Sequence, residues 1–131
     1  MCVLTACGPT AQTYQVSVIN QSATPMTVVL TKDGPPMEQG WMPPEDVAMM
    51  RKAPADLTVN GIVVQPKTKV DQERSGKFDN GTHAMLRVYR GEQNMKQMLG
   101  VGPDSMNRRD LVLHPGQNTI VIDPSGNAEA R

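Results

Sequence analysis

Aromatic side chains and unbalanced charge are both scarce in this sequence. Only 3% of its 131 residues are Phe, Trp or Tyr, and 13 Lys and Arg are offset by 13 Asp and Glu. Proteins that bind nucleic acids usually carry a surplus of basic residues, often beside exposed aromatic rings. The composition therefore argues against a nucleic-acid partner. It also means that the core has to be built from aliphatic side chains and methionines.

Long apolar runs and the common enzyme motifs are missing as well. No stretch approaches the roughly 18 apolar residues of a membrane-spanning helix. There is no G-x-S-x-G elbow and no Walker loop. Gly100-Val101-Gly102 begins like a dinucleotide-binding fingerprint, but Pro103 follows and the third glycine is absent. We therefore predict a protein that is not an enzyme and that uses no cofactor.

Proline and glycine, in contrast, are abundant, with 11 of each, and they separate short apolar segments. Apolar and polar residues alternate most clearly at 13–22 and 84–90, which is typical of half-buried strands. The other predicted strands share β-branched residues and flanking turn signals: 26–34, 57–66 (a hairpin or one bulged strand) and two within 110–126. The pattern predicts an all-β domain, a β-sandwich of about seven or eight short strands with an immunoglobulin-like or Greek-key topology.

One short helix is predicted at about 44–51. Pro44 suits the first helical position, Glu45 and Asp46 fall in the first turn, and the basic Arg51 falls in the last. These placements complement the helix dipole, which favours acidic residues at the start and basic residues at the end. The segment therefore interrupts an otherwise β-rich chain.

Three features leave alternatives open. Residues 67–77 are mostly polar and predict a loop or an exposed edge strand, and residues 95–102 are ambiguous. Trp41, the single tryptophan, is either a core side chain beside the helix or an anchor for a ligand.

His83 and Met85 form a His-x-Met pair that would lie on one face of a strand. Imidazole and thioether ligands suit Cu(I), and further ligands could come from nearby residues: Met95, Met98, Met106 and His114. The stretch G-T-H-A-M-L resembles part of the motif of the periplasmic copper chaperones, small β-sandwich proteins with such a pair late in the chain. That family has another Met or His upstream, whereas 58–64 holds neither. The alternative is that both side chains are exposed or pack under a loop.

Both cysteines, Cys2 and Cys7, lie among the first seven residues. The sequence L-T-A-C that ends at Cys7 resembles the lipobox of bacterial lipoproteins. This resemblance implies that the Cys7 thiol is acylated and anchors the protein to a membrane. Only three residues precede the lipobox, so we expect that the natural start of the gene lies upstream of Met1 or that the chain has been shortened. The alternative is that this four-residue match arises by chance.

Five longer sequence motifs also resemble those of small bacterial lipoproteins of no known activity. In chain order they are N-x-S (Asn20 to Ser22), P-x-T-V-x-L-x-K-x-G-P-P (Pro25 to Pro36), W-x-x-P-E-D (Trp41 to Asp46), L-R-V-Y-R-G (Leu86 to Gly91) and L-x-P-G-x-N (Leu113 to Asn118). The predicted organisation has a signal-peptide remnant, lipobox and tether at 1–12, a sandwich domain at 13–126 and a frayed tail at 127–131.

These observations predict a lipid-anchored protein of the bacterial cell envelope that faces the periplasm or the exterior. Its sandwich would be a binding or structural module, with its ligand left open and with another envelope protein as a possible partner. The alternative is a periplasmic copper carrier that uses His83 and Met85.

Overall fold

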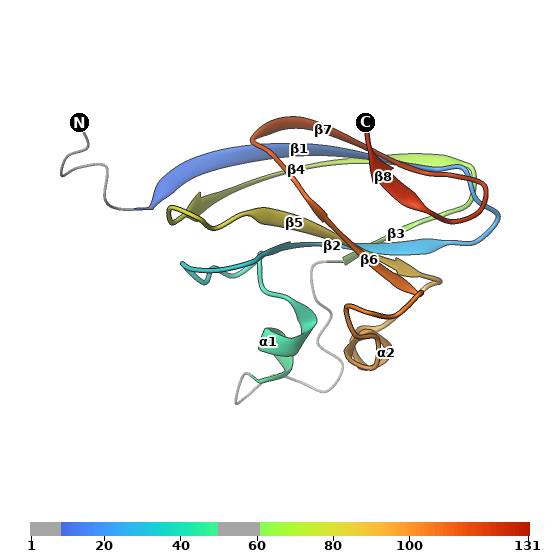
Figure 1. Cartoon of the computed structure of the whole chain (residues 1–131), viewed down its shortest axis with the longest axis horizontal. Coiled ribbons are helices and arrows are strands. Elements are labelled where there is room, and N and C mark those ends of the chain that lie inside the picture. The colour runs from blue at the N-terminus through green and yellow to red at the C-terminus, as the bar shows by residue number, and fades with distance from the viewer. Residues whose placement is uncertain (1–8, 50–60) are drawn as a thin grey trace.

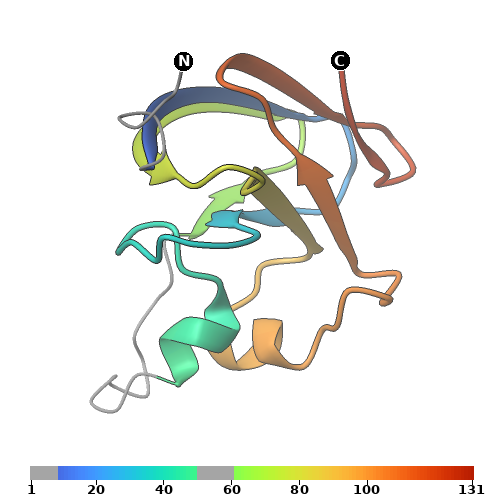
Figure 2. The same cartoon turned by 60° about the vertical axis from the view of Figure 1, so that its left-hand side comes forward.

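The fold is an all-β sandwich, as the sequence predicts. The computed structural model describes residues 9–49 and 61–131. Two four-stranded sheets lie face to face, in the strand orders β4-β1-β7-β8 and β3-β2-β5-β6, and two short helices lie beside the second sheet (Figures 1 and 2). The strands are β1 (Thr10–Asn20), β2 (Met26–Lys32), β3 (Gly61–Val64), β4 (Thr68–Phe78), β5 (Ala84–Arg90), β6 (Arg108–Val112), β7 (Gly116–Ile122) and β8 (Ala128–Ala130).

Strand β1 organises the first sheet. It pairs antiparallel with β4 from Thr10 opposite Phe78 to Asn20 opposite Thr68, and it pairs parallel with β7. Strand β4 is the outer strand of this sheet, so the edge-strand alternative for 67–77 is confirmed. The chain crosses between the two sheets after β1, β3, β4 and β6. The finer choice between an immunoglobulin-like and another Greek-key topology stays a prediction.

The main core lies between the sheets and follows the predicted alternation. Leu86 and Val88 of β5 face Val16 and Val18 of β1 across the sandwich, and all four are buried. A strand directs alternate side chains to opposite faces. The period of two in the sequence is therefore sufficient to identify the inward residues.

A second, smaller core covers the outer face of the second sheet. There Val29 and Tyr89 are buried against Val47 and Met98, which belong to α1 (Pro44–Ala48) and α2 (Met95–Leu99). Figure 2 shows both helices beneath this sheet. These two helices explain why Tyr89 is fully buried although it points away from the main core.

The two helices differ from the prediction in length and in number. Helix α1 begins at Pro44 as predicted and ends at Ala48; Arg51, Lys52 and residues 57–60 of the third predicted strand lie outside the described residues. Helix α2 forms within the ambiguous segment because Asn94 and Gln97 make a capping box, in which each side chain accepts a backbone N–H of the other.

The ends of the domain lie outside the predicted boundaries. Strand β1 begins at Thr10, inside the predicted tether, because β4 is long enough to pair with these polar residues. The expected frayed tail is wrong, because β8 pairs with β7 and Ala128 is buried. Within the described ranges, neither helix has the length and apolar character needed to cross a membrane.

Candidate functional site

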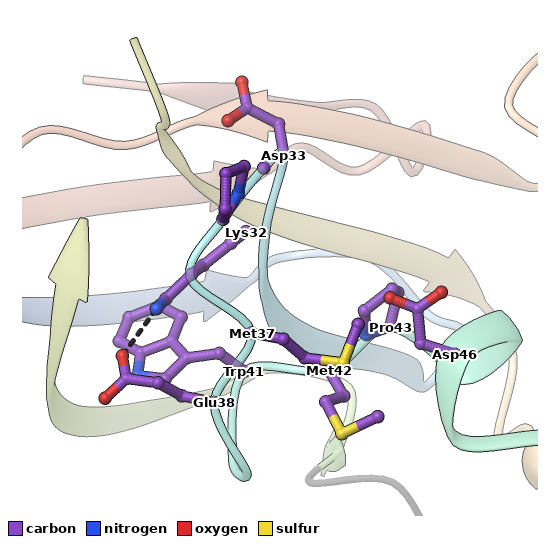
Figure 3. A pocket seen from close by; sticks show the side chains of 10 residues that line it. Lys32, Asp33, Met37, Glu38, Trp41, Met42, Pro43 and Asp46 are labelled. Atoms are coloured by element: carbon purple, nitrogen blue, oxygen red, sulfur yellow. Dashed lines mark hydrogen bonds and ion pairs between the residues drawn. The ribbon is translucent and has the colours of Figure 1, made fainter. Parts of the chain in front are cut away.

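A cavity of about 370 Å³ opens at the end of the sandwich where β2 ends. This is also the end at which β1 begins and β4 finishes (Figure 1). Its walls come from the loop after β2 and from the start of α1: Lys32, Asp33, Gly34, Pro35, Met37, Glu38, Trp41, Met42, Pro43 and Asp46. Figure 3 shows the thioethers of Met37 and Met42 between Trp41 and Asp46.

A buried lysine forms the polar side of this cavity. The Lys32 side chain is only 3% exposed, and its ammonium group donates hydrogen bonds to Glu38 Oε1 (2.5 Å), to the Pro36 carbonyl (2.8 Å) and to the Lys77 carbonyl (2.5 Å). Burying an unpaired charge is very costly. Here one carboxylate and two carbonyl oxygens replace the water that the ammonium group loses.

Glu38 connects the loop after β2 to the edge strand β4. Its Oε1 accepts both the Lys32 ammonium and the Lys77 backbone N–H, the latter at 2.7 Å. The hydrogen bond from Lys32 is the main cause that holds the pKa of Glu38 below its ordinary value, and the Lys77 N–H adds to it. The carboxylate therefore stays ionised in mildly acidic solution.

Three of the few aromatic rings meet at the base of the cavity. The Trp41 ring is edge-on to Tyr14 and to Phe78, with centroids 5.8 and 5.3 Å away, and its Nε1 donates to the Ser75 carbonyl at 3.0 Å. Such edge-to-face pairs are favourable beyond the area that they bury. Trp41 is 2% exposed, so the core alternative for this residue is confirmed.

Gly76 of β4 is the residue that makes room for the Trp41 ring. A Cβ atom at this position would lie 2.6 Å from Trp41 Nε1 and 3.0 Å from Glu38 Oε1. Any larger residue would displace the indole or the carboxylate. The floor of the cavity therefore depends on a glycine that does not line it.

The lining of the cavity combines apolar side chains with acidic groups. Besides Glu38, the carboxylates of Asp33 and Asp46 lie on its lining, and Met37 is 66% exposed. A site with this lining can bind an apolar group by removing it from water. Lys32 is the one cation among the described residues of the lining, and it is already paired with Glu38 and two carbonyl oxygens.

The predicted copper pair lies beside this cavity but is engaged differently. His83 precedes β5, and its Nδ1 is hydrogen-bonded to Asp33 Oδ2 at 2.8 Å, while its backbone N–H donates to Asp33 Oδ1. Met85 lies half-buried on β5, between Thr31 of β2 and Val112 of β6.

The other methionines and histidine proposed as copper ligands lie in different surroundings. Met98 and Met95 belong to the second core, Met106 is 95% exposed, and His114 bonds the adjacent Pro115 carbonyl. No group of three or more His, Cys, Asp or Glu residues that could hold a metal ion occurs in the described ranges. Copper binding at His83 and Met85 stays a prediction, and Cys7 lies outside the described residues.

Sequence reasoning missed Lys32, Glu38 and Gly76. A lysine at the end of a strand normally reaches solvent, and the six-residue separation from Glu38 predicts no contact. A glycine inside a strand does indicate a close approach of another group, so Gly76 carried a usable signal. No protein-family model matches the chain, and no match was found among curated proteins.

Proposed function

We propose that this protein is a lipid-anchored binding protein of the bacterial cell envelope. Acylation at Cys7 would hold it on the membrane, and the cavity beside Trp41 would take a small, mainly apolar group. The observation that carries the proposal is the position of this cavity at the end of the sandwich where β1 begins (Figure 1). The lipobox-like sequence L-T-A-C lies just before that strand.

The short distance in sequence between Cys7 and β1 supports this arrangement. Thr10 is the first residue of β1, and three extended residues reach at most about 10 Å. An acyl chain on Cys7 would therefore bring this end of the sandwich close to the bilayer surface. The exposed Met37 and the rest of the cavity lining would then face the membrane-proximal space, where apolar groups are concentrated.

The lipid anchor is tested by metabolic labelling with an alkyne analogue of palmitate. The gene is expressed in a bacterium together with its own upstream DNA, and label is measured for wild type, Cys7→Ser and the control Cys2→Ser. We expect label in wild type and in Cys2→Ser and none in Cys7→Ser. Unlabelled wild type, or label retained in Cys7→Ser, would contradict the proposal.

The cavity is tested with Trp41, because the chain has no other tryptophan. We expect the apolar probe N-phenyl-1-naphthylamine to quench Trp41 fluorescence saturably. Met42→Gln should weaken this binding by adding a polar group to the cavity wall. Met106→Gln is the matched control because Met106 projects into solvent. Equal binding by both variants would rule out the cavity as the binding site.

A further inference from the structure

A second pocket, of about 230 Å³, lies at the opposite end of the sandwich. It opens where β5 ends and β6 begins, beside the turn between β7 and β8 (Figure 1). Among the described residues, its lining includes three arginines and no carboxylate: Met26, Val88, Arg90, Ser105, Met106, Asn107, Arg108, Arg109, Gly126, Asn127 and Ala128. We propose that this pocket binds the phosphate group of a small soluble molecule through Arg90 and Arg109.

The strand register places these two arginines on one face. Arg109 of β6 lies opposite Val88 of β5, whose side chain points into the main core. Arg90 follows Val88 by two residues and therefore points to the same side. Diagonal neighbours on adjacent strands are within reach of long side chains, so both guanidinium groups extend over the open end of the core.

Neither of these two charges has an acidic partner within the described part of the chain. Arg90 makes one long hydrogen bond, to the Ser125 carbonyl at 3.3 Å, and packs against Gly126. Arg109 makes no side-chain hydrogen bond or ion pair with any described residue, and Asp123 uses its carboxylate to cap its own turn. Two neighbouring cations repel each other, and a bound anion would relieve that repulsion.

Arg108 differs because its charge is already neutralised. Its guanidinium lies over the Tyr89 ring on the other face of the sheet and pairs with Asp110 through two hydrogen bonds of 2.9 Å. On one face of β6, Arg108 is therefore paired with the Asp110 carboxylate. On the other face, Arg109 has no such partner among the described residues, so its charge is available to a ligand.

The remaining lining favours phosphate over carboxylate. The Ser105 hydroxyl and the side-chain amides of Asn107 and Asn127 donate no hydrogen bond to a described residue. A tetrahedral phosphate can accept from several directions at once, whereas a carboxylate offers two oxygens in one plane. The volume is below the roughly 300 Å³ at which pockets for drug-sized ligands begin, which fits a single phosphate group with the rest of the ligand outside.

The test is isothermal titration of the full chain with inorganic phosphate in a buffer free of other oxyanions. Loss of one charged hydrogen-bond donor should weaken binding about tenfold or more, so we expect this loss in Arg109→Gln and in Arg90→Gln. Arg109→Lys should be intermediate because it keeps the charge and loses the planar fork. Arg131→Gln is the matched control, since Arg131 is exposed and pairs with Glu129.

Four outcomes would overturn the proposal. These are no saturable binding of phosphate up to about 10 mM, unchanged binding in both Gln variants, tighter binding of acetate than of phosphate, and binding of phosphatidic acid vesicles without binding of free phosphate. Arg109→Gln should not disturb the fold, because its side chain contacts no hydrogen-bond partner in the described ranges. Its thermal unfolding transition should match that of wild type.

Discussion

Replacing Gly76 with alanine should destabilise this protein, although the usual expectation is the opposite. Glycine in a strand is unfavourable by roughly 0.5–1 kcal/mol relative to alanine, so an exposed Gly→Ala change within a strand is normally neutral or stabilising. Here the new Cβ would lie 2.6 Å from Trp41 Nε1 and 3.0 Å from Glu38 Oε1. Both groups are held in place by hydrogen bonds, so neither can move without loss.

The magnitude follows from three contributions. Overpacking a filled core costs about 1–3 kcal/mol, and loss of the Trp41–Ser75 hydrogen bond costs about 0.5–1.5 kcal/mol. These losses are offset by about 0.5–1 kcal/mol, because alanine loses less conformational entropy than glycine when it is fixed in a strand. We therefore expect the free energy of unfolding to fall by about 0.5–4 kcal/mol.

Urea unfolding followed by both circular dichroism and Trp41 fluorescence measures this change. The native emission of Gly76→Ala should also shift to longer wavelength, because the indole leaves its buried position. Gly102→Ala is the control: apart from its chain neighbours, no described residue has an atom within 4 Å of the new Cβ, and its backbone is not left-handed. The stability of this variant should therefore be unchanged or slightly higher than that of wild type. Wild-type stability and emission in Gly76→Ala would refute the assigned packing of Trp41.

Two further predictions concern buried polar groups. Asn20→Ala should lower the free energy of unfolding, measured by urea titration, by about 2–4 kcal/mol. The reason is that the buried Asn20 side chain donates a hydrogen bond to the Val64 carbonyl and accepts hydrogen bonds from the Ser22 N–H and hydroxyl. A loss below about 0.5 kcal/mol would contradict this prediction. The pKa of Glu38 is lowered in the folded protein, mainly by the hydrogen bond from Lys32. The contribution of the ionised Glu38 to folding stability is therefore fully present above its ordinary pKa of 4.5, and it is lost as the pH falls through the lower pKa of the folded state. Thermal unfolding between pH 3 and 7 should therefore show a flatter acid limb for Glu38→Gln than for wild type, and parallel curves would show that Glu38 does not carry this effect.

The sequence predicted those parts of the fold that depend on local periodicity. Strands β1 and β5 alternate clearly because every second side chain is buried in the main core, although Tyr89 on the other face of β5 is buried by the second core. Strand β4 was harder to predict, because it is an edge strand whose outward residues are polar and whose buried residues are only Gly76 and Phe78 near one end, with Val70 partly buried against the core. Its existence depends on pairing with β1 rather than on its own pattern.

The elements that the sequence missed are set by capping and pairing. Helix α2 needs the reciprocal hydrogen bonds of Asn94 and Gln97, and β8 needs the free edge of β7. A five-residue helix and a three-residue strand are too short to show a hydrophobic period. The capping residues were visible in the sequence, whereas the edge of β7 was not, because it exists only once the first sheet has formed.

The candidate site was largely invisible from the sequence for a related reason. Lys32, Glu38 and Gly76 come from different segments and acquire their roles only where the loop after β2 crosses the end of β4. Nothing local marks Lys32 as buried. Gly76 alone carried a signal in the sequence, because a glycine inside a strand indicates a close approach of another group.

The two ends of the sandwich differ in whether their cationic side chains are neutralised by neighbouring groups. This difference predicts which kind of ligand binds at each end. At the end beside Trp41, the charge of Lys32 is neutralised by Glu38 and by backbone carbonyls. The described residues there offer an anionic ligand no unpaired cation, and they favour apolar contact. At the other end, Arg90 and Arg109 have no acidic partner among the described residues. Binding there should weaken steeply with salt, whereas binding of an apolar probe beside Trp41 should not.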